Sequence, residues 1–228
     1  MEDHSEKKYL VDLLTSKSVL KQDIYKNTIH WFNVFKVELK QCLAILSKEI
    51  NDPRVRLRYV DRGDAEAHLY IGSDVLIFSM HTNVFKLADT DFATKTSYVK
   101  NNKQNGFCGV IHIYDFLADS YEFNRPNDLG YLIGRIFINH ENHFQLEGKG
   151  KIGNLYRDFM HQVLSVEIIQ DIIFRVSIYA LEFDLLTPPY DTIKEVTVYE
   201  LQTLSYSSIL KTGKTLGFKF KSGNDFAG

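Results

Sequence analysis

The stretch "SVLKQDIYKNTIHWFNVFKVELKQCLAILSKEIN", residues 18–51, decides the fold because it contains neither glycine nor proline. Its apolar residues recur at alternating spacings of four and three, the pattern of one helical face. The first row is Tyr25, Ile29, Phe32, Leu39, Leu43, Leu46 and Ile50, interrupted only by Lys36, and the second is Ile24, Trp31, Phe35, Cys42 and Ile45. Such a broad face requires a sheet or another long helix as its partner. The helix should end at Asn51-Asp52-Pro53, since the residue before a proline disfavours the helical region.

Residues 54–148 have the pattern of antiparallel β structure. Short runs rich in β-branched and aromatic residues alternate with turn residues, which is typical of strands joined by hairpins. The expected strands are 55–59, 66–71, 75–81, 107–117 and 131–139, with the least regular stretch, and room for a short helix, at 82–103. Asn105-Gly106 is the strongest hairpin signal.

A second long helix is expected from about residue 154 to 186, because this stretch again has neither glycine nor proline. Asp171 and Arg175 have the i,i+4 spacing of a helical ion pair. The richness in isoleucine and valine leaves a strand as the alternative for this stretch. Beyond it, residues 192–208 could be helix or strand, and residues 216–221 resemble a short final strand.

This order of elements predicts an α+β fold. An antiparallel β-meander of about five to six strands should pack against two long α-helices, residues ~18–51 and ~154–186. The 228 residues are expected to form a single domain. Its parts would be an N-terminal helical segment 5–51, a β-rich middle 54–148, and a C-terminal helix and tail 154–228.

The composition is that of an ordinary soluble protein, with 27 Lys and Arg residues against 29 Asp and Glu and a formal net charge of −2. Nucleic acid is therefore an unlikely partner, although a row of arginines (Arg54, Arg56, Arg58, Arg62) leaves that alternative open. No signal peptide or membrane span is recognisable, so we expect a cytoplasmic protein with no membrane partner. Cys42 and Cys108 lack metal-ligand spacing and should be buried, reduced thiols. No metal and no cofactor is predicted.

A glycine-rich stretch, "GKGKIG" at residues 148–153, matches the GxGxxG pattern of dinucleotide-binding loops. Its context does not fit that pattern, because the loop follows a meander and lacks the parallel crossover and acidic residue of a Rossmann unit. A weaker alternative is an anion site at the start of the second helix, where free backbone N–H groups face the ligand. The candidates for it are Gly148, Lys149, Gly150, Lys151 and Arg157. The alternative is that the glycines only connect sheet and helix.

Five histidines lie in the β-rich middle: His68, His81, His112, His140 and His143. In a single strand from 135 to 147, His140 and His143 would point to opposite faces, whereas in a hairpin turn they could converge beside Glu141. Neither arrangement has the helical spacing of a metal-binding histidine pair. His112 should share a face with Val110, where a buried imidazole needs a polar partner. His112, His140, Glu141 and His143 are therefore the polar site candidates.

Two functions from different classes fit these observations. The first is a non-catalytic interaction module or small-molecule sensor, expected to be a homo-oligomer or to bind a protein partner through the helix 24–50. The second is an enzyme or nucleotide-binding protein that acts on a phosphorylated ligand held by the Gly148–Gly153 loop, with a histidine as acid or base. No catalytic signature selects the second, and whether the protein is an enzyme is left open.

Overall fold

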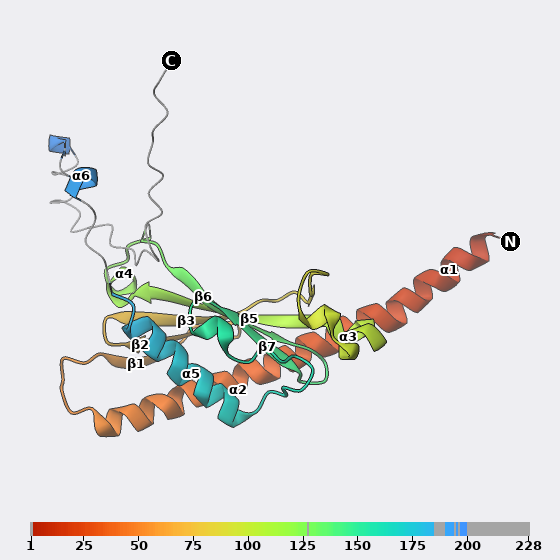
Figure 1. Cartoon of the computed structure of the whole chain (residues 1–228), viewed down its shortest axis with the longest axis horizontal. Helices are drawn as coiled ribbons and strands as arrows, with labels where there is room; N and C mark the ends of the chain where they lie inside the picture. Colours follow the sequence, from red (N-terminus) through yellow and green to blue (C-terminus); the bar gives the residue numbers. More distant parts are fainter. Residues whose placement is uncertain (1, 127, 185–189, 194, 196, 200–228) are drawn as a thin grey trace, which may run out of the picture.

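The computed structural model describes residues 2–126, 128–184, 190–193, 195 and 197–199. It is an α+β structure built on one antiparallel sheet (Figure 1). The sheet has seven strands, six of them in the order β1-β2-β3-β5-β6-β7, and the short β4 pairs with β5. The strands are β1 (Leu57–Asp61), β2 (Glu66–Ile71), β3 (Asp74–Met80), β4 (Phe85–Lys86), β5 (Phe107–Leu117), β6 (Tyr131–Ile138) and β7 (Phe144–Gly148). The expected antiparallel meander is thus confirmed.

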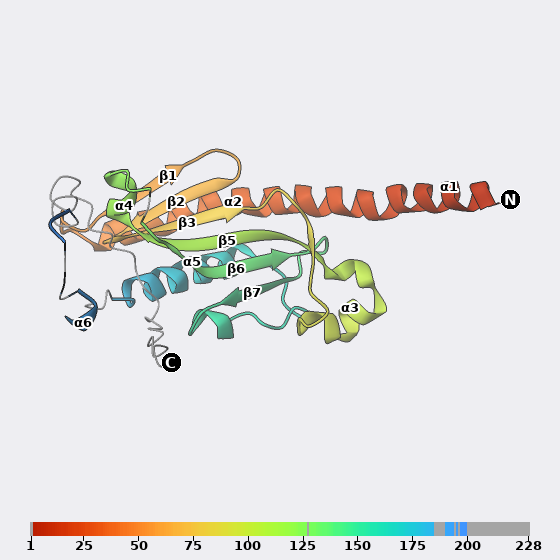
Figure 2. The ribbon, with the colours of Figure 1, turned by 90° about the horizontal axis from the view of Figure 1, so that it is seen from above.

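The first long helix is confirmed and extends further than expected. Helix α1 (Glu2–Leu13), a π-helical turn (Leu14–Ser18) and α2 (Val19–Glu49) run on continuously, crossing the sheet and projecting beyond it (Figures 1 and 2). Lys36, the one interruption of the apolar row, is nearly buried, and its ammonium lies 2.9 Å from the Asp61 carboxylate. The charge in the apolar face is therefore satisfied by a strand of the sheet.

The second helix is shorter than the expected range of about 154–186, and that prediction is wrong. Helix α5 (Val166–Leu181) has 16 residues and is preceded by its N-cap residue Ser165, whose hydroxyl accepts a hydrogen bond from the Ile168 N–H. Residues 155–164 instead run beside β7, where the Tyr156 and Gln162 carbonyls accept hydrogen bonds from the β7 backbone. The backbone N–H groups of the edge strand β7 need acceptors, and residues 155–164 supply them. This pairing outweighs the helical spacing of the apolar residues in the segment, which therefore forms no long helix.

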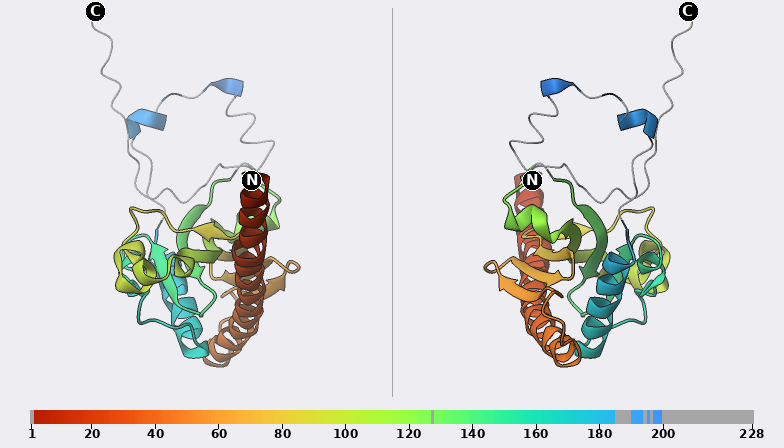
Figure 3. Two further views of the ribbon diagram at one scale, coloured as in Figure 1. Left: turned by 90° about the vertical axis from the view of Figure 1, so that its right-hand side faces the viewer. Right: turned by 90° about the vertical axis from the view of Figure 1, so that its left-hand side faces the viewer.

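Helices α2 and α5 lie side by side on one face of the sheet (Figure 3). The core between the layers contains large apolar side chains from α2, the strands and α5. Its members include Phe32, Phe35, Leu39, Phe78, Ile111, Ile136, Phe144 and Ile173, all at most 1% exposed. The broad apolar face of residues 24–50 is thus largely used inside the chain.

The opposite face of the sheet is covered only in part. One end carries α4 (Ala118–Glu122), with Ala118 packed near Val75 and Ile77. The other end carries the connection from β4 to β5. This connection contains α3 (Ser97–Asn101) and two short 3₁₀ turns, Ala93–Lys95 before α3 and Lys103–Gly106 after it. Asn105-Gly106, expected as a hairpin, lies in the second of these turns. Between the two covers the middle of β5 and β6 remains accessible.

The remaining predictions concern the ends of the chain. The final strand at 216–221, most of 192–208 and the end of the second helix at 185–186 lie outside the described residues. Two short helical turns follow β7 in the chain, the 3₁₀ turn η4 (Ile152–Asn154) and, after α5, the single turn α6 (Tyr190–Ile193). None of the described helices is long and apolar enough to cross a membrane.

Candidate functional site

A groove of about 630 Å³ lies on the sheet face opposite α2 and α5, between its two partial covers. Successive residues of a strand point to opposite faces, so Ile111 and Ile113 enter the core while Val110 and His112 face the groove. The floor is apolar and the walls carry ionisable groups. The lining residues are His81, Phe85, Lys86, Leu87, Ala88, Thr90, Asp91, Val110, His112, Arg135, Phe137 and Glu147.

His112 occupies the middle of the groove floor. It lies directly opposite Arg135 across the β5–β6 pair, and its ring centroid is 6.2 Å from that of His81. Burial lowers the pKa of His112, and the positive charge of Arg135 and the neighbouring His81 lower it further. The imidazole, expected to be buried, is only partly buried, and neither ring nitrogen has a hydrogen-bond partner among the described residues.

His81 and Phe85 form one wall of the groove. The His81 Nδ1 accepts a hydrogen bond from the Asn83 backbone N–H at 3.0 Å, which leaves the proton of the neutral ring on Nε2. The same ring meets Phe85 edge-on, with the centroids 4.7 Å apart. Phe85 is 40% exposed, so this wall offers an aromatic surface beside an N–H donor.

Arg135 and Glu147 form the other wall. They are paired positions of β6 and β7, and the Arg135 Nε and Nη2 both donate to the same oxygen, Oε2, of Glu147. The guanidinium also stands 5.2 Å from the Phe137 ring centroid. Pairing to a single oxygen leaves Nη1 of Arg135 outside this ion pair.

The hydrogen-bonding groups of the groove are unevenly engaged. Asp91 accepts from the Ala93 N–H and the Gln145 amide, and Glu147 accepts from Arg135. By contrast, the His81 Nε2 and the Arg135 Nη1 are donors with no hydrogen-bond acceptor in the part of the chain that the structure describes. The groove therefore suits a molecule that presents acceptor oxygens to these donors and an apolar body to Phe85 and Phe137.

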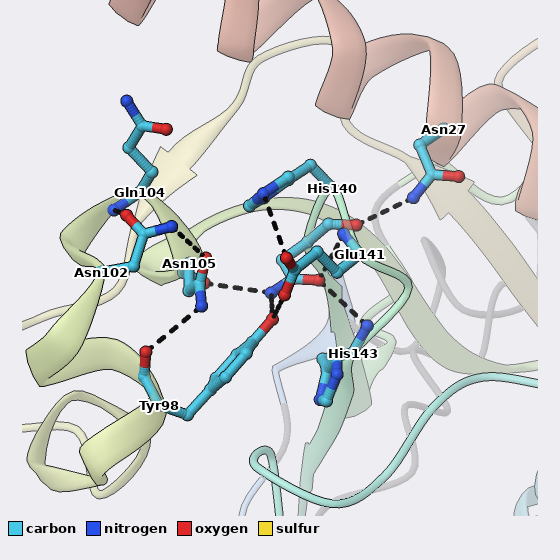
Figure 4. A network of polar contacts seen from close by, with 9 residues as sticks. Asn27, Tyr98, Asn102, Gln104, Asn105, His140, Glu141 and His143 are labelled. Atoms are coloured by element: carbon cyan, nitrogen blue, oxygen red, sulfur yellow. Dashed lines mark hydrogen bonds and ion pairs between the residues drawn. The ribbon is translucent and has the colours of Figure 1, made fainter.

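The segment with His140, Glu141 and His143 is the turn between β6 and β7, so the hairpin alternative is confirmed. At its centre is the buried Asn139, whose side-chain oxygen Oδ1 accepts hydrogen bonds from the N–H groups of Glu141 and His143, both at 2.9 Å. The Asn139 amide donates to the Tyr98 hydroxyl, and the Asn27 amide donates to the Asn139 backbone oxygen (Figure 4). The turn is thus clamped between α2 and α3.

The two imidazoles of this turn do not converge. His143 stacks on Tyr98 with ring centroids 4.4 Å apart, and its Nδ1 lies 3.0 Å from the Phe159 carbonyl oxygen. His140 lies beside Glu141, with 3.9 Å between its Nε2 and the carboxylate. Figure 4 shows the two rings on different sides of the turn. Their observed contacts hold the turn in place, and His140, Glu141 and His143 lie outside the groove that contains His112.

The glycine loop differs from its expected setting, since it leads into the short turn η4 and not into a long helix. Lys149 and Lys151 line different surface hollows, and the Lys151 ammonium lies 3.0 Å from the Glu182 carboxylate. The Arg157 Nε donates to the Gly153 carbonyl oxygen. The structure therefore does not bring the three basic candidates together, and anion binding here stays a prediction without the helix N-terminus on which it depended.

Close backbone packing explains two of these glycines. A Cβ at Gly153 would overlap the Gly148 carbonyl oxygen, and one at Gly148 would overlap the Ile152 side chain. Gly150 has a φ of +52°, which favours glycine. The three glycines fold the end of β7 against η4, as the connection alternative predicts.

Three of the four arginines in the row Arg54, Arg56, Arg58 and Arg62 form ion pairs with acidic side chains. Arg56 and Arg58 form ion pairs with Glu122 of α4 at 3.0 and 3.5 Å, and Arg54 pairs with Asp52 at 2.6 Å. Nucleic-acid binding by this row stays a prediction. Both cysteines are buried and unpaired, and burial raises the pKa of Cys42 to about 11 and that of Cys108 further. Within the described residues, no three His, Cys, Asp or Glu side chains could together hold a metal ion.

Sequence reasoning found one residue of the groove, His112, and missed His81, Arg135 and Glu147 as its partners. Alternation along each strand places side chains on a face, but the register between strands decides which of them become neighbours. The cross-strand pair Arg135–Glu147 could have been predicted from the sequence, because opposite charges at equal distances on the two sides of a hairpin turn indicate such a pair. Comparison of the chain with protein-family models, curated proteins and solved structures finds no match.

Proposed function

We propose that the chain is a non-catalytic binding module that holds a small organic acid in the groove between β4, β5 and β6. The observation that carries this proposal is the partly buried His112, which lines the groove opposite Arg135 and has no hydrogen bond from either ring nitrogen to the described residues. A carboxylate would accept hydrogen bonds from Arg135 and from one ring N–H, and charge-assisted hydrogen bonds of this kind are the stronger ones. The apolar body of the ligand would lie on Phe85 and Phe137.

Binding fits the groove better than catalysis does. Among the described residues, neither His81 nor His112 is hydrogen-bonded to a carboxylate or hydroxyl group, the arrangement that orients a general base or activates a nucleophile. The volume of about 630 Å³ lies in the usual range for small-molecule pockets. A module with one such groove would act as a sensor or carrier of its ligand.

Thermal unfolding tests the proposal with benzoate, phenylacetate and indole-3-acetate as probes and benzamide as the uncharged control. A probe at about a hundredfold excess over its dissociation constant contributes ~2.7 kcal/mol, a rise in Tm of roughly 5–10 °C for a chain of this length. Arg135→Gln should weaken binding about tenfold or more, since it removes a charge-assisted bond. Arg175→Gln is the matched control, because Arg175 also forms an ion pair, with Asp171, outside the groove.

The outcomes separate the two candidate functions. No shift with any of the three acids, or equal shifts in Arg135→Gln and Arg175→Gln, would count against the groove. A shift with phenyl phosphate that disappears in the double variant Lys149→Ala, Lys151→Ala would support the phosphorylated-ligand alternative at the Gly148–Gly153 loop.

A further inference from the structure

The first helical turns form an arm, residues 2–19, that stands away from the rest of the chain. Figures 1 and 2 show α1 continuing past the end of the sheet with no other element beside it. None of residues 5–19 is buried, and Leu20 is the first buried residue of the long helix. At 1.5 Å per residue, the arm is roughly 27 Å long.

The arm exposes large apolar side chains to water, which is unfavourable for a helix that has no packing partner. Tyr9, Leu10 and Leu14 are 66%, 56% and 55% exposed. Isolated helices of this length are marginal in water, because most helical stability in proteins comes from packing of an apolar face. Continuity with α2 supplies a nucleus for the arm, but nothing among the described residues packs against its outer turns.

Three pairs of residues in the arm are related by reversal about the midpoint between Val11 and Asp12. Around this point Leu10 mirrors Leu13, Tyr9 mirrors Leu14, and Glu6 mirrors Lys17 with the opposite charge. The positions 6, 10, 13 and 17 are spaced by four, three and four, so they share one helical face. On this face, reversal of the chain direction exchanges Leu10 with Leu13 and Glu6 with Lys17, whereas Val11 and Asp12 at the midpoint lie off the face.

We propose that the arm pairs in antiparallel orientation with the arm of a second copy of this chain. A two-fold axis at the midpoint would set each Leu10 against the partner's Leu13, as an interface between identical copies requires. It would also set Glu6 beside the partner's Lys17. Neither Glu6 nor Lys17 forms an ion pair within the described chain. Parallel pairing would set each Glu6 against the partner's Glu6, so charge selects the antiparallel arrangement.

The geometry of the arm permits this pairing. The two bodies would lie at opposite ends of the paired arms, because each body meets its own arm only from Lys17 onward, the last of the paired positions. The Lys17 ammonium lies 5.9 Å from the Phe107 ring centroid at the base of the arm, and the Lys17 side chain is exposed. The apolar face of residues 24–50 is not needed, since its own sheet and α5 cover it.

This inference is independent of the ligand groove and changes the expected self-association surface from residues 24–50 to the arm. With four apolar side chains from each copy, the interface is small. We therefore expect a reversible dimer with a dissociation constant on the order of 10–100 micromolar.

Disulfide trapping tests the orientation. We expect an equimolar mixture of Glu6→Cys and Lys17→Cys chains to form a disulfide heterodimer under mild oxidation, while each variant alone forms several-fold less. Cys42 and Cys108 are buried and do not interfere. Cross-linking of each variant with itself, but not in the mixture, would show parallel pairing and overturn the proposal.

Sedimentation equilibrium of the full chain tests the surface. Leu10→Lys should weaken the dimer at least tenfold, and Ile45→Lys, a comparable exposed position of α2 at 49%, should leave the dissociation constant unchanged. Glu6→Lys should weaken it, and the double variant Glu6→Lys, Lys17→Glu should restore it. A monomer at 500 micromolar overturns the proposal, and so does co-sedimentation of such a monomer with anionic phospholipid vesicles, which would make the arm a membrane-binding helix.

Discussion

Thr28 of α2 fills the space left by the missing side chain of Gly109 on β5. The Thr28 hydroxyl donates to the Ile24 carbonyl oxygen at 2.7 Å, so the side chain is held on its own helix. A Cβ at Gly109 would overlap the Thr28 Oγ1 and lie 2.8 Å from its Cβ. This close approach fixes the distance and the rotation of the long helix on the sheet.

Gly109→Ala should therefore destabilise the protein by about 3 kcal/mol or more. The clash involves the Cβ of Thr28 as well as its hydroxyl, so a change of rotamer cannot relieve it and the helix must move. Urea unfolding followed by circular dichroism measures the change. The matched control is Gly134→Ala on β6, where the added Cβ would meet its nearest atoms at 3.5–3.7 Å, and which should cost less than about 1 kcal/mol. Equal losses in the two variants would contradict this account of the helix–sheet contact.

Asn139→Ala should loosen the turn between β6 and β7. The variant leaves the N–H groups of Glu141 and His143 and the Asn105 carbonyl oxygen without their partner, in a turn where Asn139 itself is fully buried. The buried Asn105 carbonyl costs roughly 1–3 kcal/mol when unsatisfied, and the two N–H groups add less because Glu141 is exposed and His143 only partly buried, so the total should be about 2–4 kcal/mol. The exposed Asn154→Ala is the control. Hydrogen exchange should show faster exchange of the Glu141 and His143 amides, and unchanged rates would argue that other contacts hold the turn.

The outline of the fold was readable from the sequence because its periodicities are long and uninterrupted. Residues 18–49 show one helical face over many turns, and β2 and β5 coincide with runs bounded by turn residues. The sequence predicts a helix over 155–164 because Leu155, Phe159 and Val163 have helical spacing, but the structure has none there. Phe159 is 1% exposed, but it packs against the covering segment of the sheet instead of the core between the helices. Ser165, a preferred residue before a helix, was the signal that could have placed the start of α5.

The groove could not be read in the same way. His112 was singled out by its place on an apolar strand, whereas its nearness to Arg135 depends on the β5–β6 register. That register is shifted at Ile113/Tyr114 by an irregularity that no sequence pattern announces. His81 reaches the groove only because the chain after β3 turns to form β4 along β5. Long-range pairing of this kind is set by the whole sheet.

Lys36 and Asp61 should respond unequally to neutralisation. The Lys36 side chain is 11% exposed and that of Asp61 is 47% exposed. Asp61→Asn leaves a nearly buried ammonium without its counter-ion and should lower the free energy of unfolding by about 1–2 kcal/mol. Lys36→Met leaves a half-exposed carboxylate in water, so it should change the free energy of unfolding by less than about 1 kcal/mol. The surface pair Lys86–Asp89 is the control, since neutralising either partner should change little. A larger loss in Lys36→Met than in Asp61→Asn would refute this ordering.

His68 should make the protein less stable as the pH falls below about 6.5. Burial lowers the pKa of His68 and outweighs the opposing effect of Glu66, whose carboxylate lies 2.7 Å from Nε2. Because the folded pKa lies below the unfolded value of roughly 6.5, the unfolded chain binds more protons there and stability declines toward acid.

Urea unfolding at pH 7, 6 and 5 measures this dependence on the intact chain and on His68→Leu. The variant removes the titrating group, so its free energy of unfolding should fall less over this range, with a difference in slope of at most about 1.4 kcal/mol per pH unit. If His68→Leu and the intact chain lose stability in parallel, other groups cause the acid dependence. The difference between the folded and unfolded pKa of His68 would then be too small to affect stability.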